Sequence, residues 1–184
     1  EVHVVKGKIN LDQITFESVV RLRSKKCFFR HSVHSGKIQS YKKEKNQIIL
    51  SINASGAPNE SGLDNLSKDS ICGKILLVNT DTKKFEIYSS GHRNIIGMYS
   101  DEKIILATEH GPFAGDEINN IKKDASYGWP VSSYGEKYSR GQTNEPPNYK
   151  KSHKEHGFSE PIFSFIPAIG ISEIIKLPND FSEL

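Results

Sequence analysis

The chain has 184 residues, of which 35% are hydrophobic and 26% charged, so it is long enough and apolar enough to bury one globular core. No apolar run approaches the roughly 18 residues that a membrane-spanning helix needs. The first residues show neither an apolar targeting segment nor an initiator methionine. These totals exclude a disordered chain and a helical membrane protein, and we treat residues 1–184 as one domain.

The net charge of +3 is unevenly distributed along the chain. Residues 1–50 carry 11 Lys/Arg against 4 Asp/Glu, a net of +7, whereas residues 51–184 carry 14 against 18, a net of −4. A basic half could face an anionic partner. Nucleic-acid modules interleave aromatic and basic residues in known patterns, and none is present. We therefore interpret the basic residues as solvated strand faces and expect no nucleic-acid partner.

Cysteine and histidine spacing does not indicate a zinc site. Cys27 and Cys72 are too few for a disulfide framework and lack the spacing of metal ligands. One bridge between them is an alternative, but two unpaired, buried cysteines are the favoured expectation. Two H-x-x-H pairs, at 31–34 and 153–156, have no third ligand at metal spacing.

Short apolar runs rich in Ile, Val, Leu and Phe recur along the chain, separated by polar turns. No window of a dozen residues has a 3.6-residue period, so long helices are not expected. The fold class predicted is therefore all-β, with meandering antiparallel strands. The polar stretch 131–160 predicts a long loop, and loops of this length often carry function. In chain order, the predicted strands cover residues 14–23, 25–33, 36–41, 47–53, 73–80, 84–90, 95–100, 103–109, 116–122 and 169–178.

A weak internal repeat points to a particular all-β architecture. Residues 40–56 resemble residues 98–111, and their Ile-Ile-Leu triplets lie 56 positions apart. A repeat of this size, at four strands per unit, is typical of propeller blades. A sandwich with coincidental similarity is the alternative.

Five short motifs follow one another in the stretch 73–135: "GKILLVN", "GHRN", "EHGP", "GDEIN" and "YGWP". In this order they resemble the soluble pyrroloquinoline-quinone (PQQ) sugar dehydrogenases, the glucose/sorbosone and aldose dehydrogenase family. The resemblance is looser over 31–56 and 158–181. It implies a six-bladed β-propeller of the quinoprotein type with PQQ in its central channel. This chain would supply about three four-stranded blades of that propeller.

The resemblance also implies which residues contact the cofactor. Arg93 and Asn94 of "GHRN" match the family's pair of PQQ contacts, a guanidinium and an amide suited to carboxylate and carbonyl oxygens. His110 matches a polar side chain against PQQ. The backbone carbonyls of Gly111 and Pro112 match those that bind the Ca²⁺ ion holding PQQ, and carbonyl oxygens suit this hard cation.

A second, structural Ca²⁺ site is implied at Glu117 and Tyr127. Because side chains alternate along a strand, Asp116 should face the opposite side from Glu117, beside the channel, where it would support the cofactor contacts. Trp129 of "YGWP" is expected to do no more than pack in a turn.

The catalytic base is where the sequence departs from the family. The family places a His three residues before a Gly, whereas Val33 stands three residues before Gly36 here. His34 lies two residues before that glycine and His31 five residues before it. A one-residue deletion would bring His34 to the channel, which makes it the candidate base. A loop histidine without function is the alternative.

The resemblance implies a PQQ- and calcium-dependent sugar dehydrogenase that passes hydride from a sugar hydroxyl to PQQ. The alternative is a propeller-derived binding module that kept its calcium turns and lost catalysis. A small-molecule sugar substrate, an external electron acceptor and a periplasmic or secreted location follow from the family. Since the chain is roughly half a family chain, it is either a partial chain or forms a homodimer through open blade edges.

Overall fold

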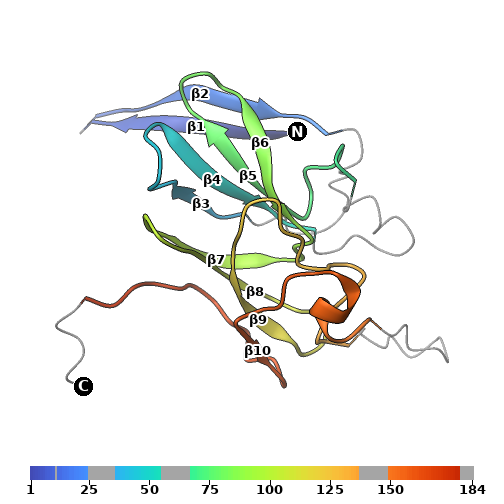
Figure 1. The fold of residues 1–184 in the computed structure, drawn as a ribbon. Helices are drawn as coiled ribbons and strands as arrows, with labels where there is room; N and C mark the ends of the chain where they lie inside the picture. The colour runs from blue at the N-terminus through green and yellow to red at the C-terminus, as the bar shows by residue number, and fades with distance from the viewer. Residues whose placement is uncertain (11, 25–35, 55–66, 137–148, 179–184) are drawn as a thin grey trace, which may run out of the picture.

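The computed structural model describes residues 1–10, 12–24, 36–54, 67–136 and 149–178, which form β-strands and one short 3₁₀ helix (Figure 1). None of the described residues belongs to a helix long and apolar enough to cross a membrane. The elements are β1 (Val2–Ile9), β2 (Ile14–Leu22), β3 (Ile38–Ser40), β4 (Gln47–Ile52), β5 (Lys74–Asn79), β6 (Phe85–Ser90), β7 (Ile95–Ser100), β8 (Ile105–Glu109), β9 (Asp116–Asn120), η2 (His153–His156) and β10 (Phe163–Phe165).

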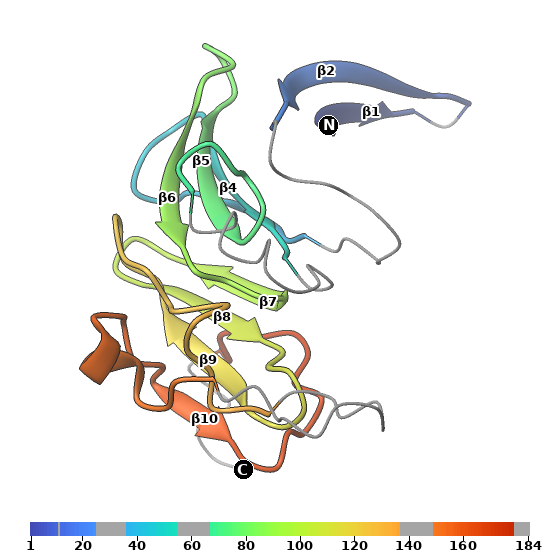
Figure 2. The ribbon, with the colours of Figure 1, turned by 90° about the vertical axis from the view of Figure 1, so that its right-hand side faces the viewer.

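The strands form two four-stranded antiparallel sheets and one two-stranded hairpin. The first sheet has the order β3-β4-β5-β6 and the second β10-β9-β8-β7, so each is a meander of consecutive strands. The two sheets lie one beside the other, and the β1–β2 hairpin lies beyond the first (Figures 1 and 2). Each sheet has the strand order of a propeller blade. Within the described residues, the expected three blades are therefore two four-stranded sheets and a hairpin.

The internal repeat corresponds to equivalent strands of the two sheets. Its first Ile-Ile-Leu triplet lies in β4 and its second spans the start of β8, and each of these is the second strand of its meander. The repeat thus marks successive blade-like units.

Most predicted strands are confirmed, but the last one is wrong. Residues 171–178 have no strand conformation, although they pass beside β7. They are held by side chains: Met98 N–H donates to Glu173 Oε1 at 3.1 Å, and the Thr108 hydroxyl donates to the Ser172 carbonyl. A backbone ladder with β7 is therefore not formed. The prediction for 25–33 lies outside the described residues.

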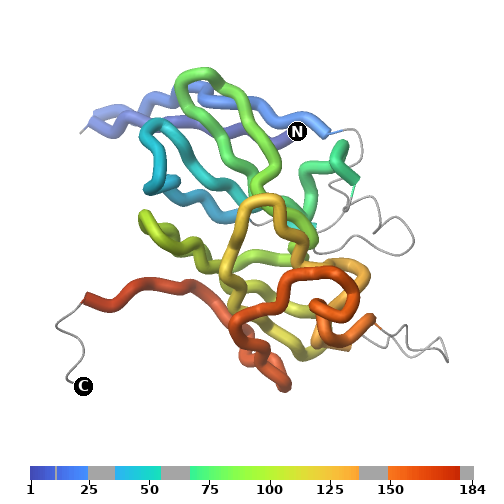
Figure 3. The backbone as a smooth tube through the Cα atoms, in the orientation of Figure 1, coloured from blue at the N-terminus to red at the C-terminus, as the bar shows by residue number. Residues whose placement is uncertain are grey.

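The C-terminal segment crosses from one edge of the second sheet to the other. It leaves β10 at one edge and reaches β7 at the opposite edge, a path that can be followed in Figure 3. Gly97 in β7 permits this close approach, because a Cβ there would lie 2.7 Å from the Ser172 carbonyl oxygen. The segment thereby becomes part of the wall around the candidate site.

The two central strands of the first sheet, β4 and β5, are largely buried on both faces, which explains their nearly continuous apolar sequences. Along each strand, alternate side chains contribute to different clusters. One cluster joins the sheet to the β1–β2 hairpin and includes Leu50, Leu76 and Val78. The other joins it to the second sheet and includes Ile49 and Ile75. Full burial of each such side chain stabilises the fold by about 1.5–3 kcal/mol.

The favoured expectation for the cysteines is wrong for Cys72, which is disulfide-bonded. Its side chain is buried in the cluster between the first sheet and the hairpin. Cys27 lies outside the described residues.

Candidate functional site

The loop 91–94 between β6 and β7 presents two of the predicted cofactor contacts. Glu109, at the end of β8, holds this loop by accepting a hydrogen bond from Arg93 N–H and contacting His92 Nδ1 at 3.1 Å. His92 Nε2 lies 2.8 Å from the Ser89 hydroxyl, and its ring stacks on that of Tyr127 at 4.8 Å. These side chains are buried, so the network positions the loop and is closed to a substrate.

The Arg93 side chain reaches from this loop to the Gly-Pro turn. Its Nη1 donates to the carbonyls of His110 at 3.0 Å and of Gly111 at 2.6 Å. The guanidinium also lies over the Trp129 ring, 5.3 Å from its centre. Trp129 packs in the turn as expected, and in addition it supports the arginine.

Asp116 and Glu117 face opposite sides of β9. Asp116 Oδ1 accepts a hydrogen bond from Gly111 N–H at 3.2 Å, and its Oδ2 accepts one from Ile171 N–H at 3.0 Å. His110 Nε2 lies 2.6 Å from the Ile171 carbonyl oxygen. Residues of the site therefore hold the backbone of Ile171 at both its N–H and its carbonyl.

A single pocket of about 480 Å³ brings together the predicted cofactor contacts and the Gly-Pro turn. Its size is in the range of small-molecule sites. The crossing C-terminal segment completes its wall. The lining residues are Arg93, Asn94, His110, Gly111, Pro112, Phe113, Ala114, Asp116, Pro167, Ala168 and Gly170. His34, the candidate base, lies outside the described residues.

Glu117 and Tyr127 line a second, small cavity, with a volume of about 10 Å³. Glu109 lines it too, directly opposite Glu117 in the ladder between β8 and β9. His153 Nε2 contacts Glu117 Oε1 at 3.2 Å, and Asn119 Nδ2 donates to Oε2 at 3.2 Å. Burial raises the pKa of Glu117, against the effect of its hydrogen bond to His153. The Glu109 charge adds to this increase in pKa.

The Tyr127 side chain is turned toward the end of β9. Its hydroxyl donates to the Asn120 carbonyl at 2.5 Å and accepts from Lys122 N–H at 2.9 Å. The phenol oxygen is thus already bonded to the backbone, and a cation in the small cavity would have to use the carboxylates and backbone carbonyls there. Among the described residues, no three His, Cys, Asp or Glu side chains converge on a metal position.

Sequence reasoning missed the residues that hold the site in place. Ser89, His92 and Glu109 form the network behind the loop, and two of them stand within the motifs "GHRN" and "EHGP". His153 was considered only for its H-x-x-H spacing, yet it pairs with Glu117 across 36 positions. Spacing along the chain carries no signal for such long-range pairs.

Comparisons with known proteins identify the family of the chain. The family described as Glucose / Sorbosone dehydrogenase matches residues 1–183. The aldose sugar dehydrogenase YliI of Escherichia coli is 38% identical over 97 residues, which are 52% of this chain and 25% of the relative. The quinoprotein glucose dehydrogenase B of Acinetobacter calcoaceticus is 33% identical over 100 residues, 47% of this chain and 21% of the relative.

Solved structures show the same fold over nearly the whole chain. The apo-form of the soluble aldose sugar dehydrogenase from Escherichia coli superposes with a TM-score of 0.70 at 23% identity, covering 93% of this chain and 51% of its own. A glucose dehydrogenase structure gives a TM-score of 0.66 at 22% identity, covering 92% and 51%. The chain thus spans about half the length of these relatives. With the family matched from residue 1 to residue 183, the chain belongs to the glucose/sorbosone dehydrogenase family.

Proposed function

We propose that this chain is part of a PQQ- and calcium-dependent aldose dehydrogenase, which oxidises a sugar hydroxyl by transferring hydride to PQQ. One observation carries the proposal. Arg93, Asn94, His110 and Asp116, which are scattered over three motifs in the sequence, line one pocket of about 480 Å³. That pocket also includes the Gly-Pro turn implied in calcium binding.

The donors at this pocket suit the carboxylates and carbonyls of PQQ. A guanidinium gives directional, charge-assisted hydrogen bonds to carboxylates. In the proposed complex Arg93 and Asn94 bind and orient the ligand, and His110, which lines the same pocket, contacts it as well. PQQ, when bound, supplies the quinone that accepts hydride. Asp116 holds the backbone of the turn through Gly111 N–H and so acts on the ligand indirectly.

Two calcium positions are proposed, and the oxygens available at each suit a hard cation. At the pocket, the carbonyls of Gly111 and Pro112 would hold the ion beside PQQ. The Gly111 carbonyl already accepts an Arg93 N–H, so the ion would share this oxygen with the guanidinium. At the small cavity, two buried carboxylates, Glu109 and Glu117, lie together, and their paired negative charge favours a cation there.

The proton of the sugar hydroxyl requires a base, and His34 is the proposed one. A positioned imidazole at the pocket would accept this proton from the hydroxyl oxygen, while hydride leaves the carbon that bears the hydroxyl. The substrate is proposed to be an aldose and the final electron acceptor an external one. On the basis of the family, we propose a periplasmic or secreted location. We also propose that this is a partial chain, and the alternative is a homodimer formed through open sheet edges.

The first experiment is a titration of the purified chain with PQQ, in calcium and in chelator, followed by absorbance. We expect calcium-dependent binding, and reduction of the quinone when aldoses are added. Binding without reduction would favour the second candidate, a binding module that has lost its base. The observation in favour of that candidate is Val33 at the family's base position. Absence of binding in calcium would overturn both.

A further inference from the structure

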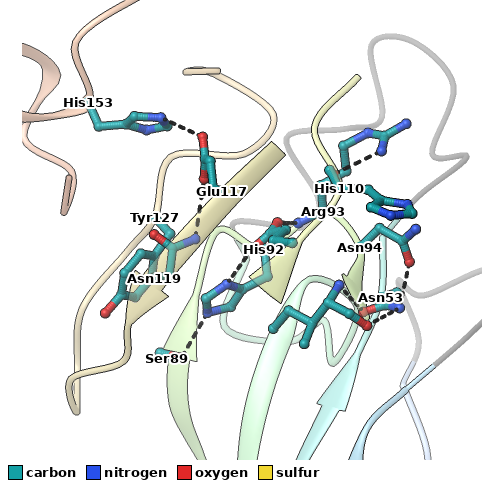
Figure 4. A network of polar contacts seen from close by, with 12 residues as sticks. Asn53, Ser89, His92, Arg93, Asn94, His110, Glu117, Asn119, Tyr127 and His153 are labelled. Atoms are coloured by element: carbon teal, nitrogen blue, oxygen red, sulfur yellow. Dashed lines mark hydrogen bonds and ion pairs between the residues drawn. The ribbon is translucent and has the colours of Figure 1, made fainter. Parts of the chain in front are cut away.

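Asn53 follows β4 directly, in the first sheet, but its side chain contacts the loop that begins the second sheet. It is almost completely buried, with 1% of its surface exposed. Its carboxamide pairs with the peptide of Ile95, accepting N–H at 2.9 Å and donating to the carbonyl at 3.2 Å. Its Nδ2 also donates to Asn94 Oδ1 at 2.7 Å (Figure 4). The neighbouring Ala54 N–H donates to the Arg93 carbonyl at 2.7 Å.

These contacts determine which way the Asn94 amide faces. A backbone N–H can only donate, so Ile95 N–H requires the oxygen of Asn53 on its side. The nitrogen of Asn53 must then face Asn94, and it requires an acceptor there. Asn94 therefore turns its oxygen to Asn53 and its nitrogen to the other side, as Figure 4 shows.

From this chain of donors and acceptors, we infer that Asn53 is a positioning residue that makes Asn94 present N–H donors to the ligand of the pocket. The inference rests on the proposed function, because the ligand concerned is PQQ, whose carboxylates and quinone carbonyls only accept hydrogen bonds. An unconstrained asparagine offers either its nitrogen or its oxygen. With Asn53 in place the acceptor orientation is excluded, and the pocket selects ligands with acceptor groups at this position.

Asn53→Asp is the variant that separates orientation from packing. Aspartate has nearly the same shape and still accepts from Ile95 N–H, but it has no N–H for Asn94 or for the Ile95 carbonyl. Two facing oxygens repel each other, so the Asn94 amide should turn over and donate to the new carboxylate. The Asn94 amide would then present its oxygen to the pocket, where the wild type presents N–H donors. We expect PQQ affinity to fall about tenfold or more.

Asn94→Asp tests the same donors without disturbing Asn53. An aspartate at this position still accepts from Asn53 Nδ2, so the buried asparagine stays paired and the fold is kept. The pocket loses its N–H donors, and PQQ affinity should fall at least as far as in Asn53→Asp.

Ser51→Ala is the matched control: Ser51 is a buried polar residue of β4, bonded to Lys37 N–H and not part of the pocket lining. It should bind PQQ as the wild type does.

The readouts are PQQ affinity, measured by absorbance in calcium, and the side-chain amide signals in ¹⁵N-labelled protein. The Asn94 NH₂ signals, assigned by their loss in Asn94→Asp, should shift in Asn53→Asp before any ligand is added. Unchanged Asn94 signals in Asn53→Asp, or wild-type affinity in Asn94→Asp, would overturn the inference. If the wild type itself does not bind PQQ, the proposed function fails, and the amide signals still decide the role of Asn53. If Asn53→Asp does not fold, Asn53→Ala, which also removes the NH₂ group that faces Asn94, takes its place with the same readouts.

Discussion

Glu109 offers the sharpest test of how the site is held. Its carboxylate accepts from Arg93 N–H through Oε1 and pairs with His92 Nδ1 through Oε2, at 3.1 Å, and only 4% of the residue is exposed. Hydrogen bonds to a charged group contribute about 1.5–3 kcal/mol each. Glu109→Ala leaves both buried donors unpaired, so we expect the free energy of unfolding to fall by about 3–5 kcal/mol.

Glu109→Gln should lower the free energy of unfolding far less, because His92 can change its tautomer. A carboxylate only accepts, so His92 donates to Glu109 from Nδ1, and with a single proton on the ring its Nε2 accepts from the Ser89 hydroxyl. With glutamine, the amide oxygen accepts from Arg93 N–H and the NH₂ group donates to Nδ1. The proton then moves to Nε2, which donates to Ser89. Every polar atom remains paired, and we expect a loss of about 1 kcal/mol.

The assay is urea unfolding followed by the emission of Trp129, the one tryptophan of the chain, which lies under Arg93. Nitrogen chemical shifts of the His92 ring report the tautomer independently. A loss in Glu109→Gln as large as that in Glu109→Ala would refute the reasoning, as would an unchanged tautomer. Phe85→Ala, at a partly exposed position at the start of β6, is the control for a general effect of substitution on stability.

Three further predictions concern metal, cofactor and pH. Glu117→Gln should reduce the rise in melting temperature that calcium gives, since a ligand stabilises only the state it binds; equal responses of variant and wild type to calcium and chelator would contradict the structural calcium site. Arg93→Ala should weaken PQQ binding about tenfold or more while the chain stays folded, by circular dichroism; an unfolded variant would mark Arg93 as structural. Burial lowers the pKa of Lys74 from 10.5 to about 8, so the unfolded chain binds this proton more tightly. The free energy of unfolding should therefore increase as the pH rises from about 8 to 10.5, by at most about 1.4 kcal/mol per unit. Lys74→Met should abolish this slope in urea unfolding, and an unchanged slope would assign it to other groups.

Much of the fold could be predicted from apolar runs and turns, because strands need only local patterns. The runs at 47–53 and 95–100 became β4 and β7 almost residue for residue. The segment 169–178 shows the limit of this reasoning. Its apolar residues suit a strand, but a strand also needs a backbone partner, and here the contacts beside β7 come from side chains. Two strands were missed, the eight-residue β1 and the three-residue β10.

The residues of the candidate site were found from motifs, whereas their supports were not. Arg93 and Asn94 stand in a recognisable tetrapeptide, and the structure places both at the pocket. Asn53 stands 41 positions before Asn94, in a stretch with no motif, and only folding brings the two amides together. The cysteine expectation failed for a similar reason, since two cysteines in a sequence of this length carry no information about their separation in space.

The contacts of Asp116 and His110 with the backbone of Ile171 give the pocket wall a dynamic property that can be measured. Because Asp116 binds Ile171 N–H and His110 contacts its carbonyl, the segment that closes the pocket cannot detach without breaking both contacts together. Asp116 also binds Gly111 N–H, so the two backbone amides share one carboxylate. In hydrogen exchange, the amides of Gly111 and Ile171 should therefore open as one unit, with a common free energy of local unfolding. A ligand in the pocket would slow the hydrogen exchange of both amides by the same factor. Exchange at Ile171 would thus report whether the pocket is occupied, even without direct contact between Ile171 and the ligand.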